Sequence, residues 1–278
     1  MIDEPTTYRR LLQDPDGSVD RFDREVLLAH AIDRDRAWIW SHLDDQVENP
    51  KHLEQYDQLL AQRTRGHPVA YLLGYREFYA RRFYVSPEVL IPRPETELLI
   101  ELALDLLPKE KARVIDVGTG SGAIGLTLAA ERPEWAVLAS DLSESALAVA
   151  SINRDQLALD RVELAHCDLL SGLSDRRFDL VISNPPYVAE GDPHLDSGDL
   201  RYEPAIALAS GHDGLDLIRL LINQAAQVLD TKGWLLFEHG YDQAEAVRAL
   251  LDAHGFEATR SWTDLSGIER ASGGRLAT

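Results

Sequence analysis

The sequence predicts an α/β protein whose sheet is mostly parallel, with a small helical domain ahead of it. Over residues 93–278, apolar segments typical of strands alternate with segments of helical periodicity, which favours a parallel sheet with helices on both faces. Turns rich in glycine or proline follow two of these strands, and ligands of such sheets bind at the carboxyl edge. A length of 278 residues leaves room for two domains.

The N-terminal domain is expected over residues 1–75 and should consist of short helices. Asn49 can cap a helix and Pro50 suits its first position, and apolar residues then recur at helical spacing over residues 53–60. A further short helix is expected over residues 68–74. This domain carries no recognisable chemistry, so we expect it to serve as a lid, as a module that docks a partner, or as a scaffold.

A β-hairpin linker is expected over residues 76–92, before a C-terminal domain at residues 93–278. Aromatic residues favour strands there, and the segment contains Phe78, Tyr79, Phe83 and Tyr84.

The C-terminal domain should follow a regular order of elements. Strands are expected at residues 113–117, 136–140, 162–165, 178–183, 234–238, 256–262 and 268–276. Helices are expected at residues 97–107, 122–131, 145–157, 214–229 and 243–253. The last strand should be antiparallel, because the final two strands follow each other closely and form a pair.

Composition excludes several classes of protein. The chain has 28 Lys and Arg against 47 Asp and Glu, a net charge of −19, which disfavours direct binding to nucleic acid. Cys167 is the only cysteine and the nine histidines lack ligand spacing, so we expect no disulfide and no metal site. Residues 1–10 lack the core of a signal peptide, and no apolar stretch is long enough to span a membrane. We therefore expect a cytoplasmic protein.

A glycine-rich turn over residues 116–122 is the first candidate for a binding site. Its glycines allow close approach to a ligand, and the following helix offers free N–H groups. The pattern Gly118-x-Gly120-x-x-Ala123 is typical of dinucleotide binding. The pattern Asp116-x-Gly118-x-Gly120-x-Gly122 resembles the first motif of methyltransferases that use S-adenosylmethionine. The turn alone does not decide between these ligands, and a turn without a ligand is the third possibility.

Two acidic residues follow the next strands. Asp141 can accept hydrogen bonds from both ribose hydroxyls of either cofactor, or it can cap the helix that follows. The resemblance to methyltransferases implies that Asp168 binds the adenine amino group and that Leu169 packs on the ring; otherwise Asp168 is a solvated loop charge.

The segment Asn184-Pro185-Pro186-Tyr187 favours a methyltransferase over a dehydrogenase. Its two prolines fix the main chain and remove two donors, which leaves a stiff loop of acceptor oxygens. The Asn184 side-chain oxygen and the Pro185 carbonyl can each accept one hydrogen of a planar NH₂ group, and Tyr187 offers a stacking face. Hydride transfer has no use for such a loop. A proline-rich strand exit without function is the alternative.

Together these motifs resemble the protein-glutamine N5-methyltransferases, specifically the release factor glutamine methyltransferases of the HemK/PrmC family. The resemblance covers about residues 68–275. Its matching segments are residues 71–78, 91–97, 116–122 and 184–187, Glu203-Pro204, Ala207-Leu208, Asp213-Gly214-Leu215, and Glu238-His239-Gly240 with Gln243.

The resemblance implies a Rossmann-like methyltransferase sheet, with S-adenosylmethionine as cofactor and S-adenosylhomocysteine as product. It implies that Asn184, Pro185 and Tyr187 are catalytic and that these residues and Pro186 bind the substrate. The implied cofactor-binding residues are Gly118, Thr119, Gly120, Ser121, Gly122, Asp141, Asp168, Leu169 and Asn184. The implied substrate is the glutamine of the Gly-Gly-Gln motif in class I peptide-chain release factors, and its methylation would modulate translation termination.

Other interpretations stay open at this stage. The alternative activities are a ribosomal-protein glutamine methyltransferase, an adenine-N6 nucleic-acid methyltransferase, and a binding module without turnover. Thr96 either borders the cofactor or caps the following helix, and Glu203 either orders a loop over the substrate or is a solvated charge.

Overall fold

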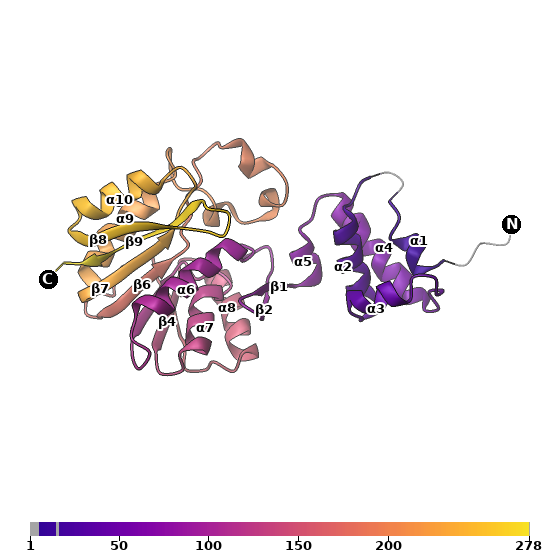
Figure 1. Cartoon of the computed structure of the whole chain (residues 1–278), viewed down its shortest axis with the longest axis horizontal. Coiled ribbons are helices and arrows are strands. Elements are labelled where there is room, and N and C mark those ends of the chain that lie inside the picture. Colours follow the sequence, from indigo (N-terminus) through magenta and orange to yellow (C-terminus); the bar gives the residue numbers. More distant parts are fainter. Residues whose placement is uncertain (1–5, 15–16, 278) are drawn as a thin grey trace. The chain divides into compact units, whose positions relative to one another are not determined.

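A computed structural model of the chain describes residues 6–14 and 17–277. The expected domain limits at residues 1 and 278, and half of the N-terminal segment considered for a signal peptide, lie outside these ranges. The chain forms two compact units, and the boundary between them along the sequence falls between Gly74 and Tyr75 (Figure 1). Among the helices of the described residues, none has the length and apolar composition that crossing a bilayer requires.

The N-terminal unit is made of helices. They are α1 (Tyr8–Leu11), α2 (Arg21–Ile32), α3 (Arg36–Ser41), α4 (Pro50–Thr64) and α5 (Val69–Leu73). The Asn49 side chain accepts the Lys51 N–H at 3.1 Å and caps α4, and Gly74 ends α5 with a φ of 76°. Helices α1 and α3 were not expected, because four and six residues are too few to show a helical period. The largest fully buried side chains of its core are those of Leu27, Leu28, Ile39 and Tyr56.

The second unit starts with a β-hairpin of β1 (Tyr75–Phe78) and β2 (Arg81–Tyr84). Tyr79, expected as a strand residue, instead lies in the turn, where it has a positive φ of 47°. The hairpin is anchored to this unit at both ends. The Tyr79 N–H donates to Glu97 at 2.8 Å, and the Asn153 amide accepts from the N–H of Tyr84 at 2.6 Å and donates to its carbonyl at 2.9 Å. The segment expected as a linker is therefore part of the second compact unit.

The main sheet has seven strands in the order β5-β4-β3-β6-β7-β9-β8. The strands are β3 (Arg113–Val117), β4 (Ala136–Asp141), β5 (Glu163–His166), β6 (Phe178–Ser183), β7 (Leu229–Glu238), β8 (Phe256–Thr263) and β9 (Glu269–Leu276). Strands β3 to β7 are parallel, and β9 pairs antiparallel with β7 and β8. The predicted α/β class, the parallel sheet and the antiparallel last strand are confirmed.

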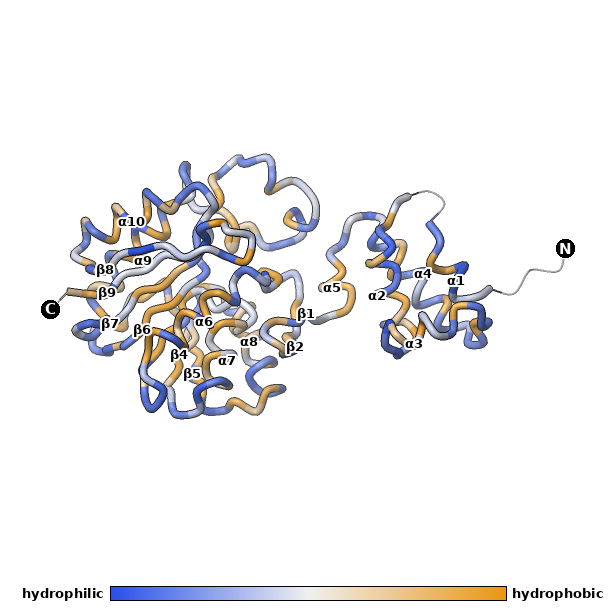
Figure 2. Tube along the Cα trace, in the orientation of Figure 1, coloured by the Kyte–Doolittle hydropathy of each residue, from blue (hydrophilic) through white to orange (hydrophobic). Residues whose placement is uncertain are grey.

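Helices cover both faces of this sheet and bury two apolar cores. They are α6 (Glu97–Leu106), α7 (Ala123–Glu131), α8 (Glu144–Gln156), α9 (Asp216–Val228) and α10 (Ala244–Ala253). Helices α6 and α7 pack with one face of β3, and α9 and α10 pack with the other face of the sheet. Figure 2 shows the resulting apolar sheet interior in orange. Burial on both faces explains why these strands lack alternation in the sequence.

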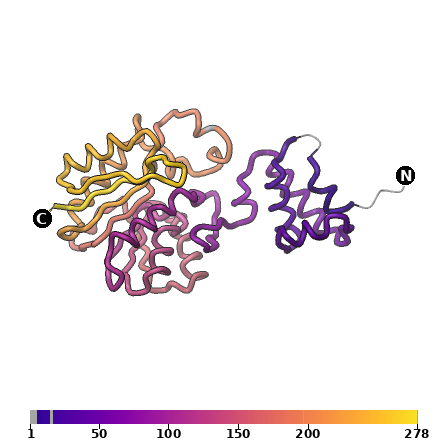
Figure 3. Tube along the Cα trace, in the orientation of Figure 1, coloured from indigo at the N-terminus to yellow at the C-terminus, as the bar shows by residue number. Residues whose placement is uncertain are grey.

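The order of the strands places a switch point between β3 and β6. From β3 the chain continues outward through β4 to β5, and then returns to add β6 and β7 on the other side. Ligands of open α/β sheets bind beyond the carboxyl ends of the strands at such a point. The long connection from β6 to α9, drawn in salmon in Figure 3, lies at this edge and contains short 3₁₀ turns at Pro193–Asp196, Leu200–Tyr202 and Ala205–Ala207.

Candidate active site

A pocket opens at this edge of the sheet, with an empty volume of about 1050 Å³ that is partly open to solvent. Nine of the residues predicted from the sequence line it: Gly118, Thr119, Gly120, Ser121, Asp141, Asp168, Leu169, Asn184 and Pro186. Gly122, Pro185 and Tyr187 are not among the lining residues. Segments that follow four different strands thus meet at one concave pocket, which is the usual form of a small-molecule site.

The glycine turn is held in a shape that requires its glycines. Gly118, Gly120 and Gly122 all have positive φ, at 68°, 55° and 85°. The fully buried Asp116 supports the turn from below: one carboxylate oxygen accepts the Thr119 hydroxyl at 2.5 Å and the Gly125 N–H at 2.8 Å. Burial raises the pKa of Asp116 to about 6.

Asp141 connects the end of β4 to the glycine turn. One of its oxygens accepts the Gly120 N–H at 2.8 Å, and the other accepts the Ser143 N–H at 2.9 Å. The cap of α8 is Ser143, whose hydroxyl accepts the Ala146 N–H at 3.2 Å. Asp141 is therefore not the helix cap, and each oxygen keeps a lone pair that can accept from a ligand hydroxyl.

Asp168 and Leu169 form the wall that follows β5. Leu169 has a φ of 52°, an uncommon conformation for a branched side chain, and it packs partly against the core under α9. The Gln224 side chain accepts the Leu170 N–H at 2.8 Å and fixes this loop to α9. Asp168 is exposed yet lines the pocket, so its carboxylate can reach a ligand.

The Asn184-Pro185-Pro186-Tyr187 loop leaves β6 at the switch point. Asn184 donates from its Nδ2 to the Thr96 hydroxyl at 3.1 Å, and Asn184 and Pro186 line the pocket. Pro185 is buried, and the Tyr187 hydroxyl donates to Glu238 at 3.0 Å. Burial, followed by the negative charge of Glu238, raises the pKa of Tyr187, so its hydroxyl stays protonated.

Glu238 was quoted above only as part of a motif, and the structure gives it a central place. It is 3% exposed, and its second oxygen accepts the Thr96 hydroxyl at 2.6 Å. Burial raises the pKa of Glu238, while the two hydroxyl donors and the charge of Arg270 act in the opposite direction. Thr96 occupies the N-cap position of α6, but its side chain makes no cap hydrogen bond and instead donates to Glu238. Thr96 also lines the pocket, as the other of its two interpretations expected.

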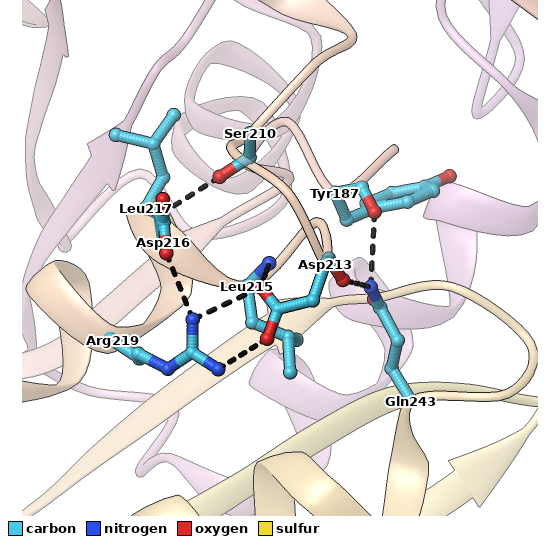
Figure 4. A network of polar contacts seen from close by, with 8 residues as sticks. All are labelled: Tyr187, Ser210, Asp213, Leu215, Asp216, Leu217, Arg219 and Gln243. Atoms are coloured by element: carbon cyan, nitrogen blue, oxygen red, sulfur yellow. Dashed lines mark hydrogen bonds and ion pairs between the residues drawn. The ribbon is translucent and has the colours of Figure 1, made fainter. Parts of the chain in front are cut away.

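A second set of contacts holds the loop by its main chain (Figure 4). The Gln243 side chain donates to the carbonyls of Tyr187 at 3.0 Å and Asp213 at 3.3 Å, and it accepts the Gly240 N–H at 2.8 Å. Arg219 in turn pairs with the Asp213 carboxylate at 2.5 Å. The side-chain amide of Gln243 thereby joins the loop after β6 to the start of α9 and to the end of β7.

Glu203 fixes the long connection to the segment before α6. It is 6% exposed, accepts the Ile91 N–H at 3.0 Å and pairs with Arg93. The alternative of a solvated charge is therefore wrong. Burial raises the pKa of Glu203, and Arg93 opposes this shift. The neighbouring Pro204 and Ile206 line the pocket.

Several lining residues were not predicted as site residues from the sequence. They are mostly small or apolar: Glu88, Val89, Leu90, Pro92, Val117, Ala123, Ile124, Leu142, Ser143, Ala146, Cys167, Ala207 and Leu217. Those at positions 88–92 lie in the segment, residues 76–92, that was expected only to link two domains. The matching segment at residues 91–97, which adjoins these positions, was the signal that could have identified them.

Comparisons with known proteins agree with this geometry. The Methyltransferase small domain family matches residues 95–198, and the PrmC N-terminal domain family matches residues 7–74. A release factor glutamine methyltransferase of Pseudomonas aeruginosa is 46% identical over 98% of this chain and 99% of its own length. One from Neisseria gonorrhoeae is 49% identical over 82% of this chain and 84% of its own.

Solved structures share the fold at low identity. A methyltransferase from Pyrococcus furiosus has a TM-score of 0.55 at 14% identity, covering 80% of this chain and all of its own. The catalytic domain of hMettl16, solved in complex with MAT2A 3'UTR hairpin 6, has a TM-score of 0.59 at 19% identity, covering 79% of this chain and 82% of its own. The fold and the pocket define an α/β methyltransferase. At the identities and coverage given above, the chain belongs to the release factor glutamine methyltransferase family.

Proposed function

We propose that this chain transfers a methyl group from S-adenosylmethionine to the side-chain amide nitrogen of the glutamine in the Gly-Gly-Gln motif of class I release factors. The observation that carries the proposal is the orientation of Asn184. Its NH₂ group is engaged by Thr96, which leaves its side-chain oxygen to accept from a substrate. The membership of the family named above supports the choice of a release factor.

The residues of the pocket suit S-adenosylmethionine. A Cβ added at Gly118 or Gly120 would meet no atom within 4 Å, so a ligand can approach the turn closely. Asp141 would accept the ribose hydroxyls, Asp168 would accept the adenine amino group, and Leu169 would pack on the adenine ring. When bound, the cofactor supplies an electrophilic methyl group.

The chain's own residues would act by positioning. The Asn184 side-chain oxygen and the Pro185 carbonyl would hold the two hydrogens of the substrate amide. This orients the nitrogen, whose lone pair is otherwise delocalised, toward the cofactor. Tyr187, anchored by its hydroxyl on Glu238, would stack on the planar amide. Alignment and electrostatics, not proton transfer, would carry most of the rate.

We further propose that the helical unit helps to dock the protein substrate. We also propose that the protein acts in the cytoplasm, because its proposed substrate belongs to the translation machinery. Neither proposal requires contact with nucleic acid, which the net charge of −19 disfavours.

Methyl transfer from labelled S-adenosylmethionine to recombinant release factor, ribosomal protein or DNA tests the proposal. Label is expected in the release factor, on glutamine. Asn184→Ala should abolish transfer and keep cofactor affinity within about threefold, whereas Asn223→Ala, on the exposed surface of α9, should keep the rate. Label confined to ribosomal protein or DNA would refute the substrate, and a mutant that loses cofactor but keeps its rate at saturation would refute the role of Asn184.

A further inference from the structure

A buried carboxylate at the end of β7 receives hydrogen bonds from two segments that border the pocket. Thr96 donates to one oxygen of Glu238 at 2.6 Å, and Tyr187 donates to the other at 3.0 Å. The 3% exposure of Glu238 leaves it almost no contact with water. Burying a carboxylate costs free energy unless its oxygens are hydrogen-bonded. The fold supplies donors to both oxygens of Glu238, although the proposed chemistry does not involve this carboxylate directly.

The direction of these bonds determines which atom Asn184 presents. A hydroxyl has one proton, and that of Thr96 is donated to Glu238, because an ionised carboxylate only accepts. The two hydroxyl donors and the charge of Arg270 favour this ionised form against the effect of burial. The Thr96 oxygen can therefore only accept from Asn184, 3.1 Å away, and the atom of Asn184 that faces it must be the NH₂ nitrogen. No protein donor among the residues that the structure describes bonds the Asn184 Oδ1, which stays available to a ligand.

We propose that Glu238 is a positioning residue that makes the site select an amide over a carboxylate. Acting through Thr96, it turns the Asn184 oxygen toward the substrate. An amide can donate to that oxygen. An ionised glutamate side chain has no hydrogen to donate, and its oxygens would face acceptors. The inference rests on the proposed function and deepens it, since it identifies what distinguishes glutamine from glutamate.

Tyr187 adds a second consequence of the same carboxylate. Because its hydroxyl donates to the other oxygen of Glu238, the ring and the Asn184 amide are fixed from one point. Exchange of the carboxylate for an amide removes the fixed direction of both bonds, since glutamine can donate at one end. Thr96 is then free to accept from it and to turn its own proton toward Asn184, which permits the Asn184 amide to flip.

The test compares the binding of two release factors in the presence of S-adenosylhomocysteine: the natural one, and one with glutamate in place of the Gly-Gly-Gln glutamine. The wild-type chain should bind the glutamine form more tightly by about tenfold or more at pH 7.5. Glu238→Gln should bring the two dissociation constants within about threefold of each other. Glu245→Gln, on the exposed side of α10, should leave the wild-type ratio.

Thr96→Val provides a second variant that removes the same relay without changing the buried charge. Thr96→Val should also bring the dissociation constants of the glutamine and glutamate forms closer together. Thr96→Ser, which restores a hydroxyl, should recover most of the wild-type difference between them. Cofactor affinity and the circular dichroism spectrum of each variant show whether it is folded. A folded Glu238→Gln or Thr96→Val that keeps the wild-type ratio would overturn the inference, as would a wild-type chain that binds both forms equally.

Binding and turnover separate this inference from the proposed function. A wild-type chain that transfers no methyl group to the release factor contradicts the proposed function, while the ratio of the two dissociation constants still decides whether Glu238 sets the preference for the amide.

Discussion

Gly214 lies where the start of α9 touches the substrate loop, and replacing it by alanine tests whether that contact positions the loop. Its φ is 75°, and an added Cβ would lie 2.2 Å from the Tyr187 carbonyl oxygen and 2.8 Å from the Gln243 Nε2. Neither distance is tolerable, and the first neighbour is main chain. The bond from Gln243 to the Tyr187 carbonyl, 3.0 Å long, therefore has to break or move (Figure 4).

The expected magnitude follows from two contributions. A left-handed conformation costs an L-residue about 1–2 kcal/mol, and a lost hydrogen bond of a partly buried amide costs about 1 kcal/mol more. Relief of the steric overlap adds to these, so the free energy of unfolding should fall by about 3 kcal/mol or more. Because the displaced atoms belong to Tyr187, kcat for release factor methylation should also fall, by about tenfold or more.

Gly255→Ala is the matched control. Gly255 has nearly the same φ, 80°, but a Cβ there would meet nothing within 4 Å. The free energy of unfolding of Gly255→Ala should fall only by the conformational cost of about 1–2 kcal/mol, which applies to any alanine at such a φ. Its kcat should stay at the wild-type value. Urea unfolding and initial rates at saturating cofactor measure both effects. Equal losses of stability in the two variants, with wild-type kcat in both, would refute the reasoning that this contact positions the loop.

Two further substitutions test the carboxylates beneath the glycine turn. Asp141→Ala should weaken S-adenosylmethionine binding by about 10- to 100-fold, the size of one or two charge-assisted hydrogen bonds, with a smaller effect on kcat. An unchanged dissociation constant by calorimetry would mean that this carboxylate binds only the main-chain N–H groups around it and not the cofactor. Asp116 has a pKa of about 6 against 3.8 without burial, so between these values the folded chain binds more protons than the unfolded chain, and stability falls as pH rises from about 4 to about 6. The fall amounts to about 3 kcal/mol and should be missing from the pH profile of Asp116→Asn; parallel profiles of the two proteins in urea unfolding would contradict the assignment.

The amino-acid sequence alone determined those parts of the protein that depend on local pattern. Apolar strands of four to ten residues, separated by helical segments, specify a parallel sheet, and β3 and β6 begin and end where the pattern placed them. Strand β7 is longer than expected because its first residues, among them Asp230 and Lys232, are polar and lack the apolar signal. The glycine turn and the Asn-Pro-Pro-Tyr loop could also be recognised in the sequence, since glycine and proline determine the allowed main-chain conformations wherever they occur.

Tertiary structure decided how those motifs are held. Thr96 and Glu238 are 142 positions apart, and Asn184 is 88 positions from Thr96, yet the three form one chain of hydrogen bonds. Asn153, fully buried, likewise joins the hairpin to the glycine turn through the carbonyls of Tyr84 and Ser121. Partners at such separations depend on the order of strands in the sheet, which no local periodicity encodes. These hydrogen-bond partners are therefore known only from the folded structure, in which nearly every buried polar group has a partner.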